Sequence, residues 1–141
     1  MKKIIFILSL LVSGTMGFAQ CDKPLMLTSS KTEHLDANGT VQRTEDEKST
    51  VEVNKTDVII RPGNESHNMK GVIKSNTCNW SVPFKEGKSL IKATITNDNG
   101  NTMNATLTIE GKDGKLTLLM EVEEMPDRKI RVPIDTFEEK K

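Results

Sequence analysis

The chain has few aromatic residues among its 141 positions: four phenylalanines, one tryptophan and no tyrosine. Phe6 and Phe18 lie in an apolar N-terminal segment, which leaves Trp80, Phe84 and Phe137 for the rest of the protein. Proteins that stack sugars or bases display such rings on their surface. The scarcity of aromatic residues therefore argues against carbohydrate and nucleic-acid binding.

An excess of either charge is also missing, because 20 basic residues stand against 20 acidic residues. Removal of Lys2 and Lys3 with the signal peptide described below would leave a net charge of about −2. Nucleic acids and anionic membranes attract proteins through basic surfaces. We therefore expect no nucleic-acid partner, and a membrane contact only if Cys21 carries a lipid.

Histidine is rare as well, since His34 and His67 are the only two. Neither stands at zinc-ligand spacing from a second histidine or a cysteine pair. The stretches LDANG and NDNGN lack the full ligand series of a calcium loop and are explained by turn formation. The chain contains no G-x-S-x-G elbow, no H-E-x-x-H motif and no phosphate-binding glycine loop. We predict no catalytic residues, no metal, no cofactor and no enzymatic activity.

Long hydrophobic runs are absent except for one at the N-terminus, from Ile4 to Val12. It follows Lys2 and Lys3 and leads to a stretch of small residues ending at Ala19, an order typical of a secretory signal peptide. The run is shorter than the about 20 residues that a membrane-spanning helix needs. We predict a signal peptide at residues 1–20, a single exported domain at residues 21–141, and a periplasmic or secreted location.

Cys21 would begin the mature chain, and the sequence leaves three fates open for it. In an oxidising compartment two cysteines favour one disulfide, here Cys21–Cys78. A free thiol is the second alternative. The third is a lipid anchor, as in bacterial lipoproteins, whose signals usually place Leu three residues before the cysteine and a small residue directly before it. This chain has Phe18 and Gln20 at those positions.

Alternating apolar and polar residues dominate the mature chain, which indicates strands with one buried face. The dipeptides Asn38-Gly39, Asn99-Gly100 and Asp113-Gly114 separate such runs and readily form tight hairpins. The pattern predicts strands at about residues 25–35, 40–46, 50–54, 57–61, 69–75, 78–84, 88–97, 103–111, 115–123 and 129–135. Cys78, Trp80, Val82 and Phe84 are expected to share the core-facing side of one strand.

These strands predict an all-β fold, an antiparallel meander of about 8–10 strands. A closed or nearly closed barrel would protect the sheet edges, and a two-sheet β-sandwich is the alternative. The charged end FEEKK is expected to be frayed.

An exported chain of this size with about ten meandering strands resembles the lipocalin-like small β-barrels of exported bacterial proteins. The resemblance spans about residues 25–137. It departs from true lipocalins because no Gly-x-Trp motif lies on the first strand and Trp80 comes mid-chain, so we transfer no binding residues.

Inward positions of the predicted strands would line a cavity or a core, and the candidates are Met69, Trp80, Met103, Leu107, Leu118 and Met120. We predict a non-enzymatic binding module that holds a small apolar ligand inside a barrel. The alternative is a protein-interaction, inhibitor or envelope-structural protein with a filled core. An interior cavity of about 300 Å³ or more would favour the ligand, and a filled interior the alternative.

Overall fold

The structure is a computed structural model that describes residues 21, 23–63, 68–97 and 99–140. The predicted signal peptide lies outside these residues, as does His67. The described residues form strands and no helix, which confirms the all-β prediction. The strands are β1 (Leu25–Ser29), β2 (Thr32–Leu35), β3 (Val41–Glu45), β4 (Ser49–Val53), β5 (Asp57–Arg61), β6 (Met69–Val82), β7 (Glu86–Thr96), β8 (Thr102–Lys112), β9 (Lys115–Val122), β10 (Met125–Pro133) and β11 (Thr136–Glu139).

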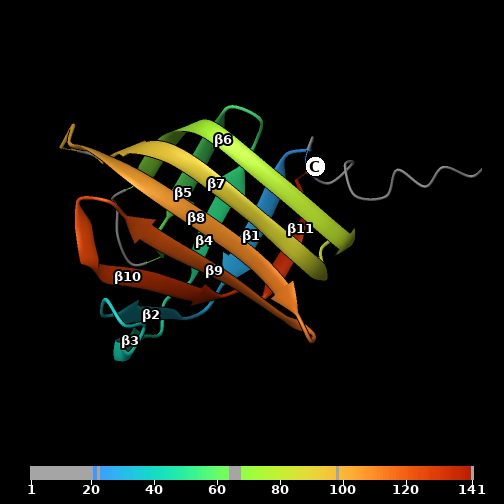
Figure 1. Cartoon of the computed structure of the whole chain (residues 1–141), viewed down its shortest axis with the longest axis horizontal. Helices are drawn as coiled ribbons and strands as arrows, with labels where there is room; N and C mark the ends of the chain where they lie inside the picture. The colour runs from blue at the N-terminus through green and yellow to red at the C-terminus, as the bar shows by residue number, and fades with distance from the viewer. Residues whose placement is uncertain (1–20, 22, 64–67, 98, 141) are drawn as a thin grey trace, which may run out of the picture.

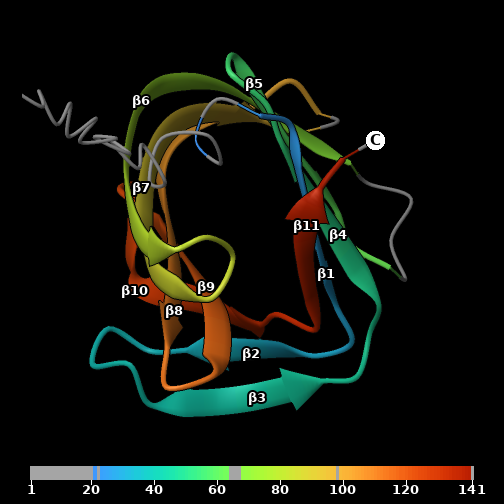
Figure 2. The same cartoon turned by 90° about the vertical axis from the view of Figure 1, so that its right-hand side faces the viewer.

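All of these strands belong to one antiparallel sheet with the order β11-β1-β4-β5-β6-β7-β8-β9-β10-β2-β3 (Figure 1). The sheet curls so that β6 to β9 lie across the interior from β1, β4 and β11 (Figure 2). The edge strands β3 and β11 do not pair with each other, so the sheet is not closed. The antiparallel arrangement that we predicted is confirmed, and closure into a barrel is not. The described residues form eleven strands rather than 8–10, and only β4 to β10 follow one another as a meander.

The predicted strand at residues 25–35 is two strands joined by a corner. At the corner, the Ser29 hydroxyl donates a 2.9 Å hydrogen bond to the Lys31 carbonyl and accepts one of 3.2 Å from the Lys31 N–H. The hydroxyl thereby provides hydrogen-bond partners for backbone groups that do not pair with a neighbouring strand. The corner takes the chain from β1, near one end of the strand order, to β2, near the other.

The predicted strands at residues 69–75 and 78–84 are instead one long strand, β6. Its register against β7 shifts between Ile73 and Ser75 and again between Trp80 and Val82. A bulge inserts one extra residue and turns the following side chains to the other face. Val82 is therefore 43% exposed, and the prediction that it shares a face with Cys78 and Trp80 is wrong.

The C-terminal stretch that we expected to be frayed forms β11. Leu27 pairs with Phe137, and Leu25 with Glu139, along the edge of the sheet. Phe137 is only 9% exposed. One buried ring therefore holds an otherwise charged segment against the core.

The predicted hairpins at Asn38-Gly39, Asn99-Gly100 and Asp113-Gly114 are confirmed by the pairing of the strands that flank them. Asp113 and Gly114 both have positive φ, 54° and 76°, which matches the twist of a two-residue hairpin. In the first hairpin, Asp36 Oδ1 accepts 2.9 Å hydrogen bonds from the N–H groups of Asn38 and Thr40. The LDANG stretch, residues 35–39, therefore forms a turn that the Asp36 carboxylate stabilises.

The core consists of the inward side chains of the curled sheet. Its buried members are Leu25, Leu27, Val51, Val53, Val58, Trp80, Ile91, Ala93, Ile95, Ala105, Leu107, Ile109, Leu118, Met120, Val122 and Phe137. Packing is close even at Gly71, where an added Cβ would lie 2.8 Å from Val58 Cγ1 and 3.1 Å from Ile95 Cγ1. The side chains of its cross-strand neighbours on β5 and β7 thus fill the space beside Gly71.

Candidate functional site

The six residues predicted to line a cavity or a core all lie in or against this core. Trp80, Leu107, Leu118 and Met120 are buried, and Leu107 is fully so. Met69 and Met103 are partly buried and pack against the same cluster. The six residues thus belong to, or pack against, the buried apolar cluster.

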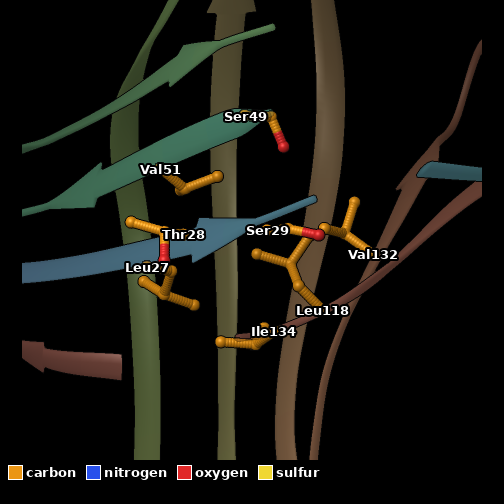
Figure 3. Close-up of a pocket in the computed structure, with 8 residues that line it drawn as sticks. All are labelled: Leu27, Thr28, Ser29, Ser49, Val51, Leu118, Val132 and Ile134. Atoms are coloured by element: carbon orange, nitrogen blue, oxygen red, sulfur yellow. The ribbon is translucent and has the colours of Figure 1, made fainter. Parts of the chain in front are cut away.

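A small pocket lies where the curled sheet fails to close (Figure 3). Its lining comes from β1, β4, β9 and the end of β10, and consists of Leu27, Thr28, Ser29, Ser49, Val51, Leu118, Val132 and Ile134. It encloses about 10 Å³, which is about the space of a single water probe. We call the boundary between β1 and β4 on one side and β9 and β10 on the other the seam. The pocket at this seam leaves room for little more than one water molecule.

Backbone hydrogen bonds across the β10–β11 corner also tie the seam together. The Ile134 N–H donates to the Leu116 carbonyl at 2.9 Å, and the Asp135 N–H donates to the Thr28 carbonyl at 2.8 Å. One short corner thus contacts both β9 and β1, which lie on opposite sides of the seam. These two hydrogen bonds stabilise the open sheet at the seam, where the strands of a closed barrel would be hydrogen-bonded to each other.

The structure contains the predicted disulfide between Cys21 and Cys78, with Cα atoms 6.0 Å apart. The two cysteines are 57 residues apart in the sequence. The bridge fastens the start of the predicted mature chain to the middle of β6. A bridged Cys21 is incompatible with a lipid on the same sulfur.

A buried hydrogen-bond chain runs from the aromatic core to this disulfide. Ser89 is the cross-strand partner of Cys78 and is 3% exposed. Its Oγ accepts a 2.8 Å hydrogen bond from Trp80 Nε1 and donates one of 3.4 Å to Cys78 Sγ. Ser89 was missed at the sequence level, although a polar residue two positions before Ile91, in an alternating strand, was a usable signal.

The three aromatic residues that follow the predicted signal peptide gather beside this chain. Phe137 meets Trp80 at 5.6 Å between ring centroids and Phe84 at 4.9 Å, both edge to face. Phe84 lies in the β6–β7 turn with a φ of 62°, which is rare for a bulky residue. The ring contact holds the Phe84 side chain of this turn against Phe137 on β11.

Two open hollows lie along β6, β7 and β8 of the sheet. One of about 540 Å³ is lined by Thr77, Asn79, Ser81, Gly87, Lys88 and Leu90, and one of about 170 Å³ by Lys74, Lys92, Ala93, Asn104, Ala105, Thr106 and Glu123. Their linings mix hydroxyl, amide and ammonium groups with apolar surface from residues such as Leu90 and Ala93. Mixed linings of this kind are typical of the surfaces through which proteins contact one another.

Glu52, on β4, is a carboxylate that pairs with two cations. Its Oε1 lies 3.0 Å from Lys140 Nζ and 3.0 Å from Arg61 Nη1, and its side chain is 16% exposed. The hydrogen bond from Lys140, assisted by Arg61, holds the pKa of Glu52 below its ordinary value. The arrangement ties the C-terminal residues to β4 and β5, which is a structural role.

Among the described residues, no three or more His, Cys, Asp or Glu side chains are grouped to hold a metal ion. A helix able to span a bilayer does not occur in the same part of the chain. Comparison of the chain with protein-family models, curated proteins and solved structures finds no match. The functional argument therefore depends on the geometry described above.

Proposed function

We propose that this chain is an exported, non-enzymatic protein that acts through its outer surface, as a protein-interaction, inhibitor or envelope-structural module. The observation that carries the proposal is the buried cluster of apolar side chains inside the curled sheet. The pocket at the seam encloses about 10 Å³, far below the about 300 Å³ that favours a small-molecule site. The seam pocket is therefore too small for the apolar ligand that was our leading expectation from the sequence.

Export to the periplasm or the exterior is part of the proposal. The Cys21–Cys78 disulfide supports it, because such bridges persist in oxidising compartments. The curled sheet with its packed seam supports a nearly closed, lipocalin-like barrel as the finer description of the fold. The signal peptide at residues 1–20 remains a prediction from the sequence.

The absence of a ligand site can be tested with a fluorescent apolar probe. We expect no saturable binding to the unchanged protein. Leu118 lines the seam pocket and is buried, so Leu118→Ala enlarges that pocket and serves as the positive control. Apolar cavities of this kind bind small apolar molecules. Saturable one-to-one binding by the unchanged protein would overturn the proposal.

Action through the outer surface can be tested by photo-cross-linking in the native host. A cross-linking residue would replace Thr77, in the larger hollow, or Lys92, in the smaller one. Lys112, at the β8–β9 hairpin, is the matched exposed control. We expect a discrete protein adduct from at least one hollow and none from Lys112. Adducts from neither hollow would contradict an interaction role for this face.

A further inference from the structure

The hydroxyl proton of Ser89 is directed at a disulfide sulfur. An indole nitrogen can only donate a hydrogen bond, so the 2.8 Å contact from Trp80 Nε1 occupies an acceptor position of Ser89 Oγ. The single hydroxyl proton is then available for Cys78 Sγ, at 3.4 Å. Both Trp80 and Ser89 are buried, at 2% and 3% exposure, so solvent does not compete for these bonds.

This hydrogen bond strengthens when the disulfide opens. A neutral disulfide sulfur is a weak acceptor, whereas a thiolate is a charged one, and hydrogen bonds to charged groups are markedly stronger. Ser89 therefore stabilises Cys78 as a thiolate more than it stabilises Cys78 in the bridge. In thiol–disulfide exchange a better-stabilised leaving thiolate departs faster.

We infer that the Cys21–Cys78 bridge is a directional thiol-exchange site, at which the thiolate of an external thiol attacks Cys21 Sγ and Cys78 leaves as a thiolate held by Ser89. The attack forms one S–S bond between the external sulfur and Cys21 and breaks the Cys21–Cys78 bond. The electron pair of the broken bond passes to Cys78 Sγ. Return attack by Cys78 releases the thiol and restores the bridge, so the step needs no further oxidant or reductant.

The consequence is a reversible attachment point at the N-terminal end of the folded chain. Cys21 precedes β1 by four residues, so an adduct there leaves the strand ladders intact. This inference does not depend on the proposed interaction surface. It assigns Cys21 a covalent thiol partner and Cys78 the role of leaving and reclosing group.

The first test uses reduced glutathione as the probe and the bridged protein from residue 21 onward. After brief exposure, acid quenching and blocking of free thiols, peptide mass spectrometry locates the glutathione adduct. We expect the adduct on Cys21 to exceed that on Cys78 by about fivefold or more. A predominant adduct on Cys78 would overturn the inference.

The second test measures the cleavage rate in Ser89→Ala. We expect the rate to fall by about threefold to tenfold and the preference for Cys21 to shrink. The control is Ser81→Ala, because the Ser81 hydroxyl donates to the Glu86 carbonyl at 3.3 Å and not to sulfur. Equal rates in the two variants would contradict the inference.

Ser89→Ala leaves the buried Trp80 N–H without its acceptor, which can prevent folding. The double variant Trp80→Phe with Ser89→Ala removes donor and acceptor together, and it should show the same loss of rate and preference. Retention of the original rate and preference in the double variant would also overturn the inference. The adduct position in the unchanged protein tests the idea independently of both variants.

Discussion

Phe137, on the last strand, meets Phe84, in the β6–β7 turn, edge to face with ring centroids 4.9 Å apart. Phe137 also contacts Trp80, with ring centroids 5.6 Å apart, so it lies between the other two rings. The contacts join the edge strand β11 to the turn of a hairpin in the facing wall. One end of the curled sheet is thus covered by aromatic side chains where no strand ladder exists.

Loss of this cluster should release β11. We expect Phe137→Ala to lower the free energy of unfolding by about 3 kcal/mol, because a buried ring is removed and a cavity is left beside Trp80. Urea unfolding followed by Trp80 fluorescence measures the change. Glu138→Ala, at the neighbouring exposed position, should change the free energy by less than about 0.5 kcal/mol. Equal effects of the two variants would contradict the proposed role of the ring.

The disulfide should contribute substantially to stability. A bridge that closes a loop across 57 positions reduces the entropy of the unfolded chain by an amount equivalent to about 4 kcal/mol. We expect the double variant Cys21→Ser with Cys78→Ser to unfold at a clearly lower urea concentration than the bridged protein. A reducing agent should lower the midpoint of the bridged protein and leave that of the double variant unchanged. An unchanged midpoint in the double variant would show that the bridge is dispensable.

Glu52 should make stability depend on pH in the acidic range. Its pKa is lowered in the folded state, first by Lys140 and then by Arg61, so its contribution is present above the unfolded pKa, about 4.3. That contribution is lost as the pH falls through the lower folded value. We expect Glu52→Gln to be less stable than the unchanged protein at pH 7 and nearly equal to it at about pH 2.

Equilibrium unfolding at several pH values measures the Glu52 difference. Glu110→Gln is a suitable control, because the Glu110 pair with Lys88 is long, at 3.6 Å, and both side chains are well exposed. Exposed pairs of this kind contribute little. A Glu52→Gln difference that stayed constant down to pH 2 would indicate a packing effect rather than an ionic one.

The Asp36 turn should need a side-chain acceptor and no metal. Asp36→Ala removes the acceptor for the N–H groups of Asn38 and Thr40, and we expect it to cost about 1 kcal/mol of stability. Asp36→Asn keeps an acceptor oxygen and should cost less. We expect millimolar calcium to leave the melting temperature of all three proteins unchanged, as measured by circular dichroism. A calcium-dependent rise that required Asp36 would contradict this account of the turn.

The local alternation of apolar and polar residues was sufficient to predict the central strands of the sheet. Ile91, Ala93 and Ile95 alternate with polar residues and are all buried in β7, and the Asn-Gly and Asp-Gly dipeptides mark the adjoining hairpins. Period-two burial and positive φ are properties of short segments. They therefore remain visible without knowledge of the fold.

The features that the sequence did not predict depend on distant contacts. The corner at Ser29 lies within a stretch that is otherwise compatible with one strand, and burial of Phe137 requires Trp80 and Phe84 from another wall. The register shift before Val82 depends on pairing with β7. The alternating core residues of β7, β8 and β9 and the Cys21–Cys78 pairing could be inferred from the sequence. Whether the inward residues line a cavity or fill the core depends on how closely the two walls approach.

The most direct test of the central claim is native mass spectrometry of the protein purified from its own host without denaturation. The account predicts the mass of the polypeptide from about residue 20 or 21 with one disulfide, free of any small apolar molecule. Co-purification of an intact protein partner would agree with it. A stoichiometric mass increment of a few hundred daltons, released by organic extraction, would contradict it, because the interior would then hold a ligand.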